Sequence, residues 1–233
     1  MKPLKPFVIA IDGHSSCGKS TVAKDLAKHL HFGFIDSGAM YRAITLYAIR
    51  NTIISNSQIK LDKLEDSLRN ISISFKFDPE TKQNITFLNG ENVEDTIRTL
   101  EVSSQVSAIS AIGFVRHHLV KLQQQMGVTK GIVMDGRDIG TVVFPHAELK
   151  VFMTASPEVR AQRRFDELTA KGDSVSFNDI LHNVKERDFI DSNRSISPLK
   201  QADDAWLLDN SSMTKEEQWQ WIMDKLSELN LIA

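Results

Sequence analysis

The nine residues from Gly13 to Thr21, GHSSCGKST, restrict the fold of this chain more than any other segment. They fit the pattern G-x-x-x-x-G-K-[ST], and an all-apolar run, FVIAI, stands just before them. Such a run is typical of a buried parallel strand, and apolar residues at four-residue spacing after the motif indicate a helix. Strand, glycine-rich turn and helix in this order predict a phosphate-binding loop in an α/β protein.

Each fixed residue of the loop has a chemical reason. Glycines let the backbone curl so that N–H groups point at phosphates, and the following helix adds its positive end. We expect Lys19 to reach the β- and γ-phosphates of ATP and the Ser20 hydroxyl to ligate Mg²⁺. The predicted ATP-binding residues of the loop are Gly13, His14, Ser15, Ser16, Cys17, Gly18, Lys19, Ser20 and Thr21.

Two residues inside the loop allow two interpretations. Cys17 lies near a helix N-terminus, where a thiol is reactive, but it also suits a position that needs a small filling side chain. His14 has the chemistry of a catalytic residue or is a loop substitution without a role. We favour the second interpretation for both residues.

Three further runs predict strands: GIVMDGRD, LKVFMTA and DAWLLDN. Helical patterns cover Glu158 to Lys171, Phe177 to Arg194 and Thr214 to Leu229, and a fourth helical region spans 101–126. Strands that alternate with helices predict a parallel sheet with right-handed crossovers. The expected fold is therefore an α/β three-layer sandwich built around a phosphate loop.

A segment with a different residue pattern interrupts the alternation of strands and helices. ISISFKF alternates strictly, DPETKQ is a turn, and NITFLNGENV is extended again, which predicts a small antiparallel insertion. We expect one domain whose core covers about 1–36, 101–155 and 203–233. A region with the inserted strands would cover about 37–100, and we expect it to bind the molecule that receives the phosphate. A lid over the phosphates would cover about 156–195.

Composition narrows the possible partners. The chain has 233 residues and a net charge of −2, so nothing drives it toward nucleic acid or an anionic membrane. A single cysteine favours a reducing compartment, and no run has the length of a membrane span. We expect a cytoplasmic, monomeric protein that binds small molecules.

The segment MDGRD bears on what happens to the phosphate. Asp135 closes a predicted strand, where it would hold Mg²⁺ through a water molecule, although a strand-end turn residue is the alternative. No acidic residue directly follows Asp135 to activate water, and the chain has no N-K-x-D guanine motif. These features favour transfer to a bound acceptor over hydrolysis.

Arginines supply the second argument for transfer. In DSGAMYR, Ser37 and Arg42 suit a phosphate or a sugar, although a capped helix with a surface arginine is the alternative. Two predicted helices carry charged sets on one face, and solvated helix faces are again the alternative. Since phosphoryl transfer requires charge neutralisation, we expect these helices to form a lid. The two sets are Arg160, Arg163 and Arg164, and Arg187, Asp191 and Arg194.

Together these motifs resemble the bacterial cytidylate kinases, a branch of the nucleoside monophosphate kinases. The resemblance runs through IDGHSSCGKST, DSGAMYR, IRTLEVSSQVSAIS, FVR, DGRDIGTVVFP and KERDFIDSNR, in the family's order over nearly the whole chain. It implies Mg²⁺- and ATP-dependent phosphorylation of CMP and dCMP. The alternatives are a kinase for another small acceptor, such as a different nucleoside monophosphate or shikimate, and a phosphate-loop nucleotide switch that transfers nothing.

The resemblance also implies roles for individual residues. Ser37 and Arg42 would contact the acceptor nucleotide and Tyr41 would line its site. Ser107 and Arg116 would read the cytosine edge.

The remaining implied roles fall on the strand end and the lid. Asp138 would accept from the cytosine amine, which uracil lacks, and Asp191 would bind the pentose hydroxyls. Arg137 would hold the acceptor phosphate, while Arg187 and Arg194 would bind that phosphate and the transferring charge. Lid residues Arg160 and Arg164 would bind the donor phosphates. The implied catalytic set is Lys19, Arg137, Arg187 and Arg194.

Overall fold

The computed structural model describes residues 3–55, 58–78, 83–170 and 172–233. The chain forms two compact units, one containing 1–34 and 127–233 and the other 35–126. The predicted acceptor-binding region, about 37–100, lies within the second unit, and its role stays a prediction.

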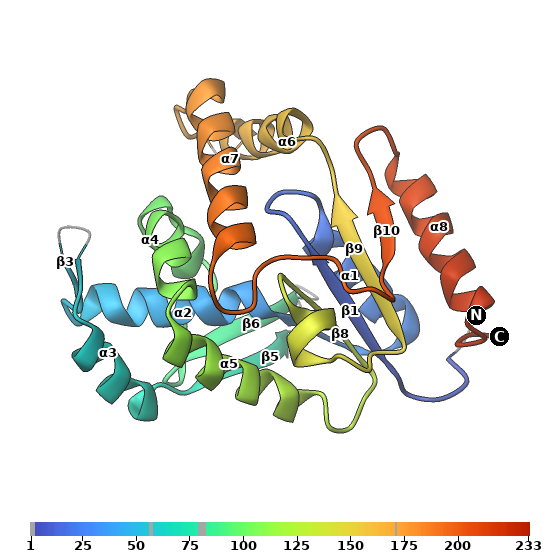
Figure 1. The fold of residues 1–233 in the computed structure, drawn as a ribbon, viewed down its shortest axis with the longest axis horizontal. Helices are drawn as coiled ribbons and strands as arrows, with labels where there is room; N and C mark the ends of the chain where they lie inside the picture. Colours follow the sequence, from blue (N-terminus) through green and yellow to red (C-terminus); the bar gives the residue numbers. More distant parts are fainter. Residues whose placement is uncertain (1–2, 56–57, 79–82, 171) are drawn as a thin grey trace. The chain divides into compact units, whose positions relative to one another are not determined.

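The first unit contains a five-stranded sheet of order β10-β9-β1-β8-β2 (Figure 1). Its central strand β1 (Val8–Gly13) is buried along its whole length and pairs in parallel with β8 (Ile132–Gly136) and β9 (Leu149–Thr154). Strand β9 pairs in parallel with β10 (Trp206–Asp209), and β2 (Gly33–Asp36) is an edge strand whose last two residues are counted with the second unit. The predicted α/β class with a central parallel sheet is confirmed.

The helices of the first unit follow the predicted pattern. They are α1 (Lys19–Leu30), α6 (Pro157–Ala170), α7 (Phe177–Asn193) and α8 (Lys215–Glu228), with a π-helical turn at Ile139–Val143. Leu26 of α1 and Ile222 of α8 are fully buried in one hydrophobic cluster with the sheet residue Ile9. Near the two ends of the described chain, Pro3 forms an isolated antiparallel bridge with Ile232 (Figure 1).

The second unit is built around α2 (Ser37–Arg50). Its other helices are α3 (Leu61–Ser67), α4 (Leu100–Ser110) and α5 (Gly113–Met126), with 3₁₀ turns at Leu68–Asn70 and Thr96–Arg98. Strands β3 (Ile54–Ser55) and β4 (Gln58–Ile59) pair in antiparallel fashion, and a second antiparallel sheet contains β5 (Ile73–Asp78), β6 (Gln83–Leu88) and β7 (Glu91–Asn92). We call β5, β6 and β7 the inserted sheet.

Some details differ from the sequence prediction. The helical region 101–126 is two helices separated at 111–112, and β2 and α3 were not predicted. The turn expected at DPETKQ falls mostly on 79–82, outside the described residues. Among the described residues, no helix has the length and hydrophobicity needed to cross a bilayer.

Candidate functional site

The phosphate loop leaves β1 through a position that only glycine can occupy. Gly13 has a φ of +145°, and a Cβ added there would lie 1.9 Å from the carbonyl oxygen of Met153 on the neighbouring strand. The backbone turns away from the sheet at this point, and Gly18 caps the start of α1. The loop is therefore shaped by its glycines, as its sequence predicted.

Lys19 lies folded over its own loop. Its Nζ donates a hydrogen bond to the His14 carbonyl at 2.6 Å, and the residue is only 5% exposed. Burial lowers the pKa of Lys19, partly offset by nearby carboxylates including Asp135. Cys17 is fully buried and its Sγ lies 3.0 Å from the same His14 carbonyl, which agrees with a filling role.

Ser20 and Asp135 lie together at the carboxyl ends of β1 and β8. The Ser20 hydroxyl donates a 2.6 Å hydrogen bond to Asp135 Oδ2, although 115 residues separate the two. Both groups offer oxygen, the ligand type that Mg²⁺ prefers, and Asp135 is almost fully buried. The pair therefore fits the predicted metal position.

A cluster of arginines converges on Asp191 within the first unit. Arg137 Nε donates to Asp191 Oδ2 at 2.8 Å, and Arg194 Nη1 lies 3.7 Å from Asp191 Oδ1. Burial opposes the charge of Asp191, yet the cations Arg137, Arg194 and Arg187 hold its pKa below the usual range. Arg194 Nη2 also lies 3.9 Å from Asp138 Oδ1. The sequence assigned all five residues to one site, and the structure brings them together.

Helices α6 and α7 contact the phosphate loop through Arg160. Its guanidinium donates to the Ser15 carbonyl at 3.3 Å and makes a bidentate ion pair with Asp188 of α7, at 3.0 and 2.5 Å. Nε donates to the Ala155 carbonyl, and the residue is 2% exposed. In this structure the Arg160 guanidinium bonds to protein groups, and its contact with ATP stays a prediction. Arg164, by contrast, lines a groove beside the loop.

Asn210 directly follows β10 and connects three parts of the first unit. Its Nδ2 donates to the Cys17 carbonyl and to Gln218 Oε1, both at 2.8 Å, and its Oδ1 accepts from Arg163 Nη1 at 3.0 Å. Arg163 also donates to the Asn210 carbonyl at 2.9 Å. Asn210 thereby joins the phosphate loop, helix α6 and the C-terminal helix α8.

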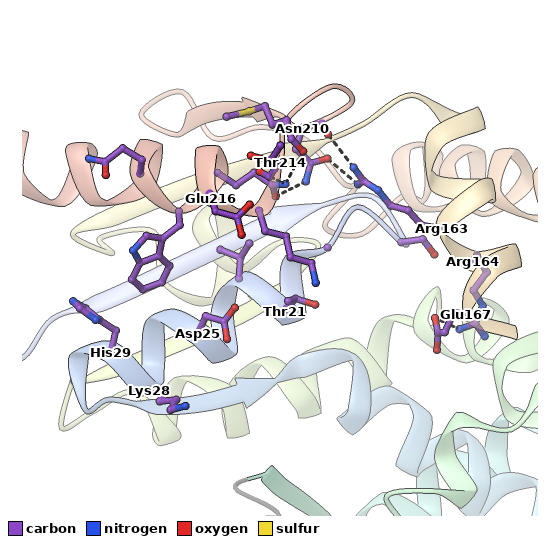
Figure 2. Close-up of a pocket in the computed structure, with 18 of the residues that line it drawn as sticks. Thr21, Asp25, Lys28, His29, Arg163, Arg164, Glu167, Asn210, Thr214 and Glu216 are labelled. Carbon is purple, nitrogen blue, oxygen red and sulfur yellow. Dashed lines mark hydrogen bonds and ion pairs between the residues drawn. The ribbon is translucent and has the colours of Figure 1, made fainter. Parts of the chain in front are cut away.

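These contacts border a groove of about 1330 Å³ that opens at the phosphate loop. Figure 2 shows Thr21 and Asp25 on one side of it, Thr214 and Glu216 on another, and Arg163 bonded to Asn210 at its end. Lys28 and His29 continue the lining along α1. A groove that leads away from a phosphate loop has room for the nucleoside part of ATP.

The second unit carries the other predicted acceptor residues. Ser37 begins α2 and is buried, and Tyr41 and Arg42 follow on the same helix. The guanidinium of Arg116, on α5, lies 5.4 Å from the centre of the Tyr41 ring and donates to a carbonyl of α4 at 3.0 Å. Ser107 is half-buried on α4.

Sequence reasoning did not assign a role to Asn210 or Asp12. Asp12 is buried and accepts 2.7 Å hydrogen bonds from the N–H groups of Ile139 and Gly140. These two residues directly follow Asp138, which the sequence assigned to CMP binding. Burial raises the pKa of Asp12 to about 6 despite those two donors. Both residues stand at the carboxyl end of a predicted strand, and that position is the signal that would have identified them.

Comparison with known proteins shows a similarity that covers nearly the whole chain. The family described as cytidylate kinase matches residues 9–228. The chain belongs to the cytidylate kinase family. The sequence resemblance and the predicted class of enzyme, a nucleoside monophosphate kinase, are thereby confirmed.

Curated cytidylate kinases match over nearly their full length. One from Bacteroides fragilis is 62% identical over 220 residues, which is 94% of this chain and 96% of that protein. One from Porphyromonas gingivalis is 54% identical, covering 96% of this chain and 97% of that protein. A solved structure of an uncharacterized protein from Eubacterium ventriosum has a TM-score of 0.50 at 12% identity, covering 96% of this chain and 99% of that one. That likeness concerns the fold alone.

Proposed function

We propose that this cytidylate kinase family member transfers the γ-phosphoryl group of ATP to CMP and dCMP. ATP binds along the phosphate loop, with its nucleoside part in the groove bordered by Arg164 and Asn210. The observation that carries the proposal is the cluster formed by Arg137, Arg194 and Asp191 at the sheet edge that also carries Lys19 and Ser20.

Catalysis follows from charge and position. The transferring phosphoryl group carries negative charge that Lys19, Arg137, Arg187 and Arg194 are suited to neutralise. A phosphate oxygen is already a nucleophile at neutral pH, so no general base is required. Arg160, which also holds the Ser15 carbonyl, and Arg164, which lines the groove, would bind the donor phosphates.

Mg²⁺ is the implied metal. Ser20 would ligate it and Asp135 would hold it through water, and both oxygens suit a hard cation. When bound with ATP, the ion supplies further neutralisation of the β- and γ-phosphate charge.

The acceptor contacts are proposed from each unit separately. In the first unit, Asp138 accepts from the cytosine amine, Arg137, Arg187 and Arg194 bind the phosphate, and Asp191 binds the pentose hydroxyls. In the second unit the proposed contacts are Ser37, Tyr41, Arg42, Ser107 and Arg116.

Cytosine selection by Asp138 is the step that an experiment can test. Uracil would present a carbonyl to the Asp138 carboxylate, so the wild-type enzyme should prefer CMP over UMP by orders of magnitude in kcat/KM. Asp138→Asn offers both a donor and an acceptor, and should reduce that preference at least tenfold. An unchanged preference would overturn the assignment. A monomeric state and a cytoplasmic location remain predictions from the sequence.

A further inference from the structure

The inserted sheet is connected to the proposed acceptor residue Arg42 by a continuous chain of polar contacts. The chain runs from Thr86 of β6 through Glu94, Arg98 and Asp36 to Arg42, all within the second unit. We propose that Glu94 and Arg98 are positioning residues, which set the availability of Arg42 for the acceptor and so give the inserted sheet a part in acceptor binding. The inference rests on the proposed role of Arg42.

Asp36 is the centre of this chain. Its Oδ1 accepts from the Ala39 N–H at 2.9 Å and so caps α2, while Oδ2 accepts from Arg42 at 2.8 Å and from Arg98 at 3.4 Å. Gly38 leaves room for this arrangement, since a Cβ there would lie 3.1 Å from both Arg42 Nη1 and Asp36 Oδ1. Asp36, Gly38 and Arg42 therefore form one local structure at the start of α2.

The contacts with Glu94 and Thr86 hold Arg98 in position. Its Nε donates to Glu94 Oε1 at 2.9 Å, and Nη2 contacts the same oxygen. Glu94 Oε2 in turn accepts from Thr86, at 3.0 Å from the backbone N–H and 2.6 Å from the hydroxyl. Because Thr86 is 1% exposed in the middle of β6, the position of Arg98 depends on the inserted sheet.

The charges of Arg98 and Asp36 explain how this series of contacts affects Arg42. Burial disfavours an ionised Asp36, but Arg42 and Arg98 hold its pKa below the usual range. Two guanidinium groups thus share one buried carboxylate. Without Arg98, Arg42 would be the main counter-ion of Asp36 and would be less available to an anionic ligand. Among the described residues, the buried Arg42 Nε has no hydrogen-bond acceptor, so this donor is still available.

A second bridge joins the same helix to the same sheet and provides a matched control. Arg50, at the C-terminal end of α2, makes a bidentate pair with Glu91 of β7, at 2.7 and 2.9 Å. This pair is more exposed than Asp36 and lies two helical turns beyond Arg42 in sequence. Breaking it should test general anchoring of the sheet without changing the counter-ions of Arg42.

The experiment compares steady-state kinetics of Arg98→Gln, Arg50→Gln and Arg42→Gln. We expect Arg98→Gln to raise KM for CMP about three- to tenfold, because the side chain is partly exposed and the interaction partly screened. KM for ATP should stay within about twofold, Arg50→Gln should resemble wild type, and Arg98→Lys should lie between wild type and Arg98→Gln.

Each outcome decides a different point. If Arg42→Gln raises KM for CMP but Arg98→Gln behaves like Arg50→Gln, the inference is overturned and the acceptor assignment stands. If Arg42→Gln leaves KM for CMP unchanged, the acceptor assignment itself fails and the inference falls with it. Should Arg98→Gln not fold, Arg98→Lys compared with Arg50→Lys decides, and equal KM values for CMP would overturn the inference.

Discussion

Replacing Asn210 with alanine removes three side-chain hydrogen bonds from a residue that is 1% exposed. The change leaves the Cys17 carbonyl, the Gln218 side chain and one donor of Arg163 without their partner. A buried polar group that loses its partner costs about 1–3 kcal/mol. Because Arg163 and Gln218 can regain water, we expect a total loss of about 2–4 kcal/mol in the free energy of unfolding.

The same substitution should affect the donor nucleotide selectively. The Cys17 carbonyl belongs to the phosphate loop, and Arg163 belongs to the lid helix α6, so both lose a common anchor. We expect KM for ATP to rise about tenfold, which corresponds to roughly 1.4 kcal/mol, while KM for CMP changes little. Urea unfolding and steady-state kinetics with each substrate varied would measure both effects.

Two further variants separate the contacts. Asn210→Asp retains an acceptor for Arg163 but turns an oxygen toward the Cys17 carbonyl, so it should impair ATP binding while keeping the lid contact. Gln220→Ala is the control, because Gln220 lines the same groove but bonds only to Asp224 through its side chain among the described residues. If Asn210→Ala matched Gln220→Ala in stability and in KM for ATP, the reasoning would be refuted.

Three other perturbations follow from the same geometry. The pKa of Asp12 is about 6 when folded against about 3.8 otherwise, so this group favours folding below about pH 4 and loses that contribution as pH rises through 6. The free energy of unfolding of wild type minus that of Asp12→Asn should shift by about 2 kcal/mol in favour of wild type between pH 7 and pH 4, and a constant difference would contradict the assignment. Gly13→Ala, whose Cβ would lie 1.9 Å from the Met153 oxygen, should abolish or severely reduce folding, whereas Gly90→Ala meets no atom within 4 Å and should cost only its turn strain, as circular dichroism would show. Ser20→Ala should raise the Mg²⁺ concentration for half-maximal activity about tenfold, and Ser20→Thr should not; equal Mg²⁺ titrations would argue against this ligand.

The sequence predicted well what depends on neighbouring residues. The phosphate loop could be recognised because its glycines, lysine and serine act through local backbone geometry, as the close approach at Gly13 shows. Strictly alternating residues predicted β5, and four-residue spacing predicted α1, since both patterns reflect one buried face. The short strand β2 has too few residues to show a pattern.

What escaped prediction depends on partners that are distant in the chain. The contacts of Arg160 with Asp188, 28 residues away, and with the Ser15 carbonyl have no signal in the local sequence. Asn210 contacts Cys17 across 193 residues, and no local pattern marks that contact. The extent of the second unit likewise follows from the packing of α4 and α5 in one core with α2, which helical periodicity alone does not specify.

The most direct test of the central claim is turnover of one enzyme sample with ATP and Mg²⁺ and a panel of acceptors, CMP, dCMP, UMP and AMP, with release of ADP measured for each. The proposed site predicts rapid turnover with CMP and dCMP, turnover with UMP and AMP lower by orders of magnitude, and slow hydrolysis of ATP without an acceptor. Equal turnover with UMP, or hydrolysis of ATP that CMP does not stimulate, would contradict the proposed site.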